Sequence, residues 1–98
     1  MATVKWSLLA RHDIREIADY IAKDSPYYSQ RMVEKIFQRV QVLEDFPMMG
    51  RVVPEFSSEN IRELIEGSYR LVYLAGKTEV VILRIHHSAR LLKNFPSK

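Results

Sequence analysis

The 98-residue sequence contains no cysteine. This absence excludes disulfide bonds and thiolate metal ligands, and it makes a reducing cytoplasm the expected location. The three histidines lack the paired spacing of zinc ligands. The sequence therefore predicts no structural metal and no cofactor.

Long hydrophobic runs are also missing. Nowhere do about 18 consecutive apolar residues occur, so we expect no membrane span, no signal peptide and no membrane partner. Glycine and proline are scarce, with three and four residues, and there is no repeat or low-complexity tract. A chain of this length with 47% hydrophobic residues predicts one compact domain, residues 1–98.

The charge balance is mildly basic. Fifteen lysine and arginine residues against twelve acidic residues give a net charge of +3 and a pI near 9.3. Such a charge suits an anionic partner but falls short of the charge of a protein that wraps DNA.

The hydrophobic pattern changes along the chain from a helical period to a strand period. A short run of β-forming residues ends at Ser7, which can cap a helix, and Ser25-Pro26 can end one helix and start the next. The expected elements are an edge strand at 3–6, helices at about 9–23 and 26–46, a loop at 47–60, and antiparallel strands at 61–65, 69–75 and 80–86.

This order, β-α-α-β-β-β, predicts an α+β domain. A helical hairpin should pack on one face of an antiparallel sheet and leave the other face free for function. Residues 88–92 can add one short C-terminal helical turn.

The last predicted strand carries the candidate site. Strict alternation places Val81, Leu83 and Ile85 in the core. Arg84 and His86 then share the opposite face.

Whether Arg70 joins this face depends on the turn that precedes the last strand. A three-residue loop, residues 76–78, places Ala75 opposite Glu79 and so pairs Arg70 with Arg84. A four-residue loop sends Arg70 to the other face. We favour the three-residue loop because it keeps an arginine out of the helix-covered core.

Two arginines and a histidine on an open face can hold a phosphate. His86 and His87 are neighbours, so both rings reach one site only if the chain turns at His87, which also brings Arg90 near. RNA cleavage without a metal requires a base for the 2′-hydroxyl, an acid for the leaving 5′-oxygen and cations around the phosphate. Histidine can act as acid or base near neutral pH, so Arg70, Arg84, His86, His87 and Arg90 form a candidate ribonuclease site.

Several short motifs follow one another over almost the whole chain. They are Trp6, the apolar pattern of the first helix, Ser25-Pro26, Gly50-Arg51, Pro54-Glu55, Ile61-Arg62-Glu63, the runs 69–73 and 80–86, and Arg90. In this order they resemble the RelE/ParE superfamily of bacterial and archaeal type II toxins. The resemblance implies a growth-inhibiting toxin and a cognate antitoxin that wraps and neutralises it, with operator DNA bound through the antitoxin.

The resemblance implies two possible targets. RelE-like members cut mRNA in the ribosomal A site with residues that match Arg70, His86 and His87, and Glu55 is an acidic candidate in the loop. ParE-like members inhibit DNA gyrase without catalysis, through the helical hairpin and the C-terminal region. We predict ribosome-dependent mRNA cleavage, with Arg70 and Arg84 stabilising the phosphate. Gyrase inhibition is the alternative, and a degenerate toxin that survives as a repressor partner is a third possibility.

Each candidate also has an ordinary structural interpretation. Arg70 can pair with Glu63 or Glu66 across a hairpin, and such a pair stabilises the fold by at most about 1 kcal/mol. His86 can bond a backbone carbonyl. The remaining arginines can be solvated or can face an acidic residue of the antitoxin.

Overall fold

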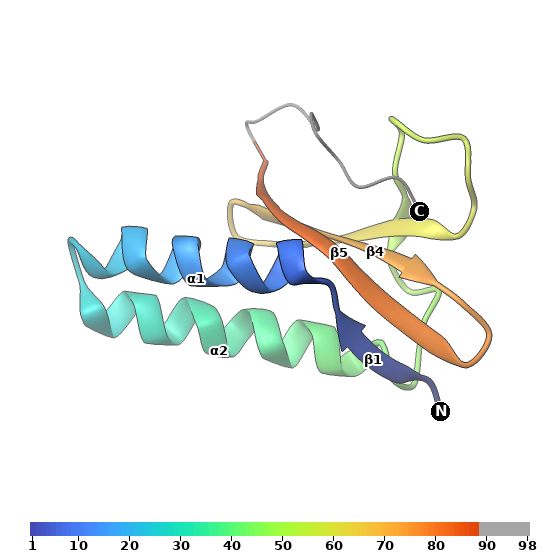
Figure 1. The fold of residues 1–98 in the computed structure, drawn as a ribbon, viewed down its shortest axis with the longest axis horizontal. Coiled ribbons are helices and arrows are strands. Elements are labelled where there is room, and N and C mark those ends of the chain that lie inside the picture. The colour runs from blue at the N-terminus through green and yellow to red at the C-terminus, as the bar shows by residue number, and fades with distance from the viewer. Residues whose placement is uncertain (89–98) are drawn as a thin grey trace.

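Two antiparallel helices cover one face of a five-stranded sheet in the computed structural model, which describes residues 1–88 (Figure 1). The elements are β1 (Thr3–Trp6), α1 (Leu8–Ala22), α2 (Pro26–Val42), β2 (Arg51–Val52), β3 (Ile61–Glu66), β4 (Tyr69–Ala75) and β5 (Glu79–His87). The predicted α+β class and the hairpin are confirmed. Residues 89–92 of the helical turn expected at 88–92, among them the candidate Arg90, lie outside the described residues.

Both helices begin at the predicted serine caps. The Ser7 hydroxyl accepts a hydrogen bond from the Ala10 amide at 3.0 Å, and the Ser25 hydroxyl accepts one from the Tyr28 amide at 3.2 Å. Helix α2 ends at Val42, four residues before the expected end at residue 46. The amides of residues 43–45 bond the carbonyls three residues back, so the last turn tightens before the chain reaches Pro47.

The sheet has the order β1-β5-β4-β3-β2. Strand β1 lies at an edge, as expected, and pairs in parallel with β5, whereas all other pairs are antiparallel. Strand β2 was not predicted because it has only two residues, which is too short for a periodic signal. It pairs with Arg62 and Glu63 of β3 and so brings part of the expected loop to the other edge of the sheet.

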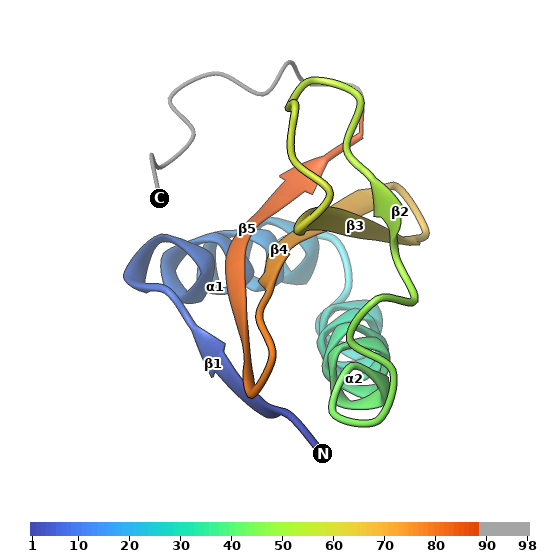
Figure 2. The ribbon, with the colours of Figure 1, turned by 90° about the vertical axis from the view of Figure 1, so that its right-hand side faces the viewer.

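The main core lies between the helices and the sheet (Figure 2). The helices and the C-cap of α2 contribute Ala10, Ile36, Val40 and Leu43 to this core. The strands contribute Leu64, Leu71, Tyr73, Val80, Ile82 and Ile85. Trp6 packs on Phe37 of α2 with ring centroids 5.0 Å apart. Trp6 is the last residue of β1, so this contact joins β1 to the main core.

The opposite face of the sheet is partly covered, which corrects the expectation of a free face. Val53 of the long loop is fully buried against Ile61 and Val72, and Phe56 and Leu74 pack around them. The loop therefore leaves only part of this face for function.

The turn between β4 and β5 contains four residues, because Ala75 pairs with Val80. The predicted three-residue loop and the pairing of Arg70 with Arg84 are therefore wrong. A β-bulge at Leu83 then shifts the register by one residue, so Arg70 pairs with His86.

The same bulge breaks the alternation expected along β5. Before it Val80 and Ile82 point into the helix-covered core, and after it Ile85 does so. The predicted core position of Val81 is wrong for this reason. A bulge adds one residue to one strand only, and a sequence pattern of period two does not reveal it.

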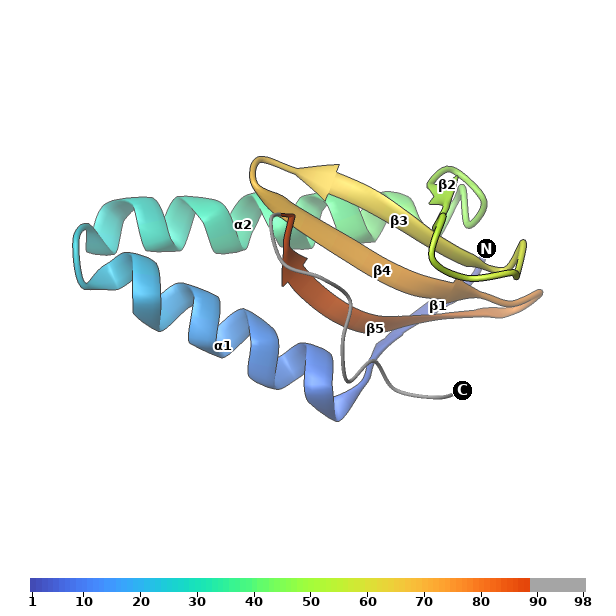
Figure 3. The ribbon, with the colours of Figure 1, turned by 90° about the horizontal axis from the view of Figure 1, so that it is seen from above.

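The helical hairpin extends past the end of the sheet (Figure 3). Its tip, where α1 passes into α2, carries the exposed side chains of Tyr20, Tyr27 and Tyr28. Within residues 1–88, neither helix combines the length and the apolar character that crossing a membrane requires.

Candidate functional site

Arg70 is the second residue of β4, the central strand of the sheet, and its side chain is only 9% exposed. Its Nε donates to Oε1 of Glu63 at 2.6 Å, and Nη1 and Nη2 donate to the two carboxylate oxygens of Glu55 at 3.1 Å each. The pairing of Arg70 with Glu63 was one of the structural interpretations of the sequence, and it is confirmed. The alternative partner, Glu66, instead lies 3.6 Å from Arg39 of α2.

Glu63 is the fixed member of this cluster. Its side chain is completely buried in β3 and also accepts a hydrogen bond from Nε of Arg51 in β2. A buried carboxylate is tolerated when cations and hydrogen bonds compensate for its lost hydration. Arg51, Glu63, Arg70 and Glu55 thus form a chain of alternating charges, which we call the Arg70 cluster.

Glu55 is the exposed member. It lies in a turn closed by the hydrogen bond from the Phe56 amide to the Val53 carbonyl, with Pro54 pre-set for its first central position. Val53 and Phe56 pack on the sheet on either side of this turn, and they hold Glu55 over Arg70. Its side chain remains 43% exposed.

The two partners also change each other's protonation. The hydrogen bond from Arg70 lowers the pKa of Glu55, although partial burial opposes this effect. The hydrogen bond to Glu55 raises the pKa of Arg70, again against desolvation. Glu55 is therefore ionised and Arg70 charged at neutral pH.

His86 and His87 point to opposite sides of β5. His86 is the cross-strand partner of Arg70, so the two side chains share the face of the Arg70 cluster, with Cα atoms roughly 4.5 to 5.5 Å apart. His87 pairs with Tyr69, and their rings meet edge to face at 5.5 Å. Because β5 continues through His87, the strand does not bring both rings to one side.

Arg84 has a structural partner that was not predicted. Its Nε and Nη2 donate to the Asp13 carboxylate of α1 at 2.8 and 2.9 Å, and this bond raises the pKa of Arg84 against desolvation. The Ile85 amide donates to the same carboxylate at 3.0 Å. The signal for Asp13 was present in the sequence, because it lies at helical spacing between Ala10 and Ile17 in an otherwise apolar stripe.

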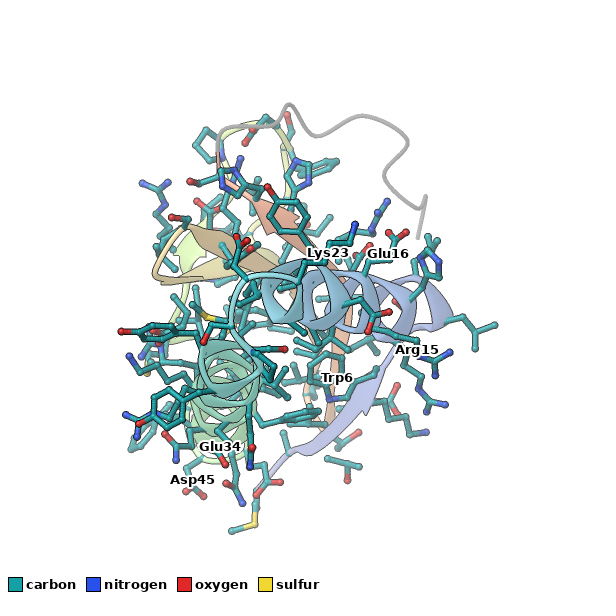
Figure 4. All side chains as sticks on the ribbon, turned by 90° about the vertical axis from the view of Figure 1, so that its left-hand side faces the viewer. Trp6, Arg15, Glu16, Lys23, Glu34 and Asp45 are labelled. Atoms are coloured by element: carbon teal, nitrogen blue, oxygen red, sulfur yellow. The ribbon has the colours of Figure 1, made fainter. Side chains whose placement is uncertain are left out.

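A groove of about 830 Å³ runs between α1 and the ends of β4 and β5. Ile17 and Ile85 are among its apolar lining residues, and Glu16, Asp19 and Lys23 contribute charges from α1. Glu16 and Lys23 lie on the same side of this helix (Figure 4). Both histidines also line the groove, whereas Arg70 does not.

Acid, base and cation are the functions that the Arg70 cluster can offer together with His86. Among residues 1–88 there is no group of three histidine or acidic side chains that could hold a metal ion. Glu55, Glu63 and Asp13 were not among the predicted catalytic residues. The sequence indicates Glu63 as a structural partner of Arg70 and Glu55 as an acidic candidate, but the loop of Glu55 has no pattern that fixes its direction.

Comparison with known proteins gives consistent matches over most of the chain. A family model described as the ParE toxin of type II toxin–antitoxin system, parDE, matches residues 4–92. Toxin RelE2 of Caulobacter vibrioides is 35% identical over 92 residues, which cover 93% of this chain and 100% of that protein.

Two solved structures have similar folds. A chain of the chromosomal ParDE TA system from P. aeruginosa has a TM-score of 0.73 and 26% identity, over 89% of this chain and 96% of that one. A chain of the toxin–antitoxin complex RelBE2 from Mycobacterium tuberculosis has a TM-score of 0.66 and 24% identity, over 91% and 93%. With the family match over residues 4–92, the chain belongs to the ParE toxin family of type II toxin–antitoxin systems, within the RelE/ParE superfamily.

Proposed function

We propose that this toxin arrests growth by cleaving mRNA on the ribosome, without a metal or cofactor, at a site built from Glu55, Arg70 and His86. The observation that carries the proposal is the bidentate pair of Glu55 and Arg70, with His86 beside Arg70 on the same face. A base, a cation and an acid are the three groups that attack by a 2′-hydroxyl requires.

The unequal burial of the two carboxylates supports separate roles for them. Glu63 is fully buried and holds Nε of Arg70, so it keeps the guanidinium in place. Glu55 is the exposed partner on Nη1 and Nη2, and a phosphate can take over these two donors. Once the phosphate has taken over these two donors, Glu55 loses their stabilisation, so its pKa rises again and its carboxylate becomes a stronger base for the 2′-hydroxyl.

His86 takes the role of general acid toward the leaving 5′-oxygen. It faces the same side as Arg70, and histidine can hold and release a proton near neutral pH. Arg84 does not bind the phosphate in this mechanism, because Asp13 holds its guanidinium. His87 has no catalytic role either, since its ring packs on Tyr69. The contribution predicted for Arg90 stays a prediction.

The partner that we propose is a cognate antitoxin. The matching family model describes the toxin of a type II toxin–antitoxin system, and the similar P. aeruginosa chain comes from a ParDE TA system. We further propose that operator DNA is bound only through that antitoxin and that the pair works in the cytoplasm.

Substitution of Glu55 by Gln is the cleanest test of the mechanism. Arg70→Ala would unbalance a buried charge network, at a cost of about 3 to 5 kcal/mol, and would confuse unfolding with lost activity. Glu55→Gln keeps the shape of an exposed side chain and removes only its negative charge. Glu59→Gln, in the same loop, is the matched control, because the hydrogen bonds of the Arg70 guanidinium go to Glu55 and Glu63.

The experiment is a pulse label after induction of the toxin alone in a bacterial host. We expect methionine incorporation to fall before thymidine incorporation with the wild type and Glu59→Gln. With Glu55→Gln, mRNA cleavage should fall by about 100-fold or more, as for the loss of a general base. Full toxicity of Glu55→Gln at equal protein levels would contradict the proposed mechanism.

Inhibition of DNA gyrase is the second candidate, and one specific observation favours it. Carboxylates already hold both Arg70 and Arg84, while three exposed tyrosines lie at the projecting tip of the hairpin. Tyrosine is enriched where proteins bind proteins. This candidate predicts an early fall in thymidine incorporation that does not depend on Glu55.

A further inference from the structure

The β-bulge at Leu83 decides which residue of β5 faces Arg70. The turn pairs Ala75 with Val80, and continuing this register would place Ile85 opposite Arg70. His86 would then oppose Tyr69, whose side chain belongs to the helix-covered core. The extra residue moves His86 to the face of the Arg70 cluster.

The bulge lies where the neighbouring strand ends. Strand β1 covers the edge of β5 only as far as Ile82, the partner of Trp6. The first turns of α1 cover the next residues instead. The Ser7 amide donates to the Ile82 carbonyl at 2.9 Å, and the Ser7 hydroxyl donates to the Leu83 carbonyl at 2.8 Å.

Asp13, which lies in α1 beyond its Ser7 cap, continues this contact. Its carboxylate accepts the Ile85 amide at 3.0 Å and two donors of the Arg84 guanidinium. The three donors thus come from the two residues that follow the bulge. The side chain of Asp13 is 8% exposed, so little water competes for these bonds.

A buried ion pair is not required for stability at such a position, because an apolar pair of similar volume often serves as well. What an apolar pair cannot do is bond the Ile85 amide. This bond fixes the backbone of β5 just after the extra residue and just before His86.

We infer that Asp13 is a positioning residue, which holds the shifted register of β5 and thereby keeps His86 on the face of Arg70. Ser7 assists it by bonding the carbonyl of the bulged residue. This inference rests on the proposed function for its catalytic consequence, but its structural part does not.

The kinetic test compares Asp13→Asn with Asp19→Asn, which lies on the same helix and lines the groove without bonding β5. Asparagine keeps the shape but cannot accept both guanidinium donors and the amide as a carboxylate does. We expect kcat for ribosome-dependent cleavage to fall by about 10- to 100-fold in Asp13→Asn, with KM nearly unchanged, because a small displacement of one catalytic group has this effect. Asp19→Asn should behave as the wild type.

The structural test is the set of cross-strand nuclear Overhauser effects between β4 and β5, measured by NMR on the purified proteins. The wild type should show contacts from Arg70 to His86, and Asp13→Asn should show a loss of these contacts or a second set from Arg70 to Ile85. Arg84→Lys keeps the charge but loses the fork, and it should give a smaller effect of the same kind. It also serves if Asp13→Asn does not fold.

The outcomes separate the two ideas. If the wild type cleaves no RNA but the register of Asp13→Asn shifts, the proposed function fails and the positioning role stands. If cleavage falls in Asp13→Asn while the contacts of Arg70 with His86 are unchanged, the positioning role is overturned. Unchanged cleavage and unchanged contacts also overturn it.

Discussion

A buried arginine on the central strand of a sheet depends on the carboxylates that surround it. Arg70 has two, and they differ: Glu63 is fully buried and Glu55 is 43% exposed. A buried partner with several hydrogen bonds has a defined position, whereas an exposed one gains little from its ion pair and can be displaced. This difference makes Arg70 both a structural group and a group that can receive an anion.

The exposed pair should make stability depend on pH. Because the pKa of Glu55 in the folded state is below its ordinary value of 4.5, its ion pair stabilises the fold above that value. This stabilisation is lost as the pH falls through the lowered pKa. We expect Glu55→Gln to reduce the free energy of unfolding by at most about 1 kcal/mol at neutral pH. The difference from the wild type should disappear in acid.

Urea unfolding followed from neutral to acidic pH measures this effect. Glu59→Gln controls for the loss of a carboxylate from the same loop, and its difference from the wild type should show no comparable pH dependence. A difference for Glu55→Gln that persisted unchanged in acid would mean that the charge of Glu55 does not contribute.

The contacts of individual residues differ in how well the sequence predicts them. The pair of Arg70 with Glu63 was predictable because both lie on adjacent strands at a spacing that a hairpin brings together. The contact with Glu55 was not predictable, because it depends on how a loop without periodicity folds over the sheet. Asp13 was visible as an acidic residue in an apolar stripe, but its partner lies 71 residues away.

Strands and helices were easier to predict than the way they join. The serine caps and the three long strands have local causes, namely side chains that bond the first amides of a helix and a pattern of period two. The four-residue turn, the bulge at Leu83 and the two-residue strand β2 do not. Each depends on contacts with distant segments, and together they decide that Arg70 faces His86 and not Arg84.

Strand β2 illustrates such a distant contact through Gly50, the residue that precedes it. The Gly50 amide donates to the hydroxyl of buried Tyr73 at 2.8 Å. A Cβ at Gly50 would lie 2.5 Å from the Glu63 carbonyl oxygen and 2.7 Å from the Tyr73 hydroxyl. Arg62 fastens the same stretch by donating to the Gly50 carbonyl at 3.0 Å.

Gly50→Ala should therefore destabilise the protein by about 1 to 3 kcal/mol, the usual cost of overpacking a closed site. Thermal or urea unfolding measures this loss. Combining it with Tyr73→Phe, which removes the hydroxyl, should not restore stability, because the backbone oxygen of Glu63 still blocks the Cβ. Wild-type stability of Gly50→Ala would mean that the start of β2 can move away from β3.

Within residues 1–88, three surfaces of the domain bear on its function. The Arg70 cluster lies on the face of the sheet away from the helices, the groove lies between α1 and the strand ends, and the tyrosines lie at the hairpin tip. His86 belongs to the first two surfaces, since it pairs with Arg70 and also lines the groove. A partner that fills the groove would therefore cover one member of the proposed catalytic site without touching Arg70.

The hairpin tip provides the test that separates the two candidate targets. Tyr27 and Tyr28 are 65% and 67% exposed, so the double substitution by serine should change the free energy of unfolding by no more than about 0.5 kcal/mol. If the toxin cleaves mRNA, this variant should still stop methionine incorporation as the wild type does, whereas Glu55→Gln should not. If it inhibits gyrase through the hairpin, the double variant should lose its effect on thymidine incorporation and on DNA supercoiling by purified gyrase, and Glu55→Gln should keep it. The variant that remains toxic is thus the double tyrosine variant under one mechanism and Glu55→Gln under the other. Measuring both in one host decides which surface of the toxin contacts its target.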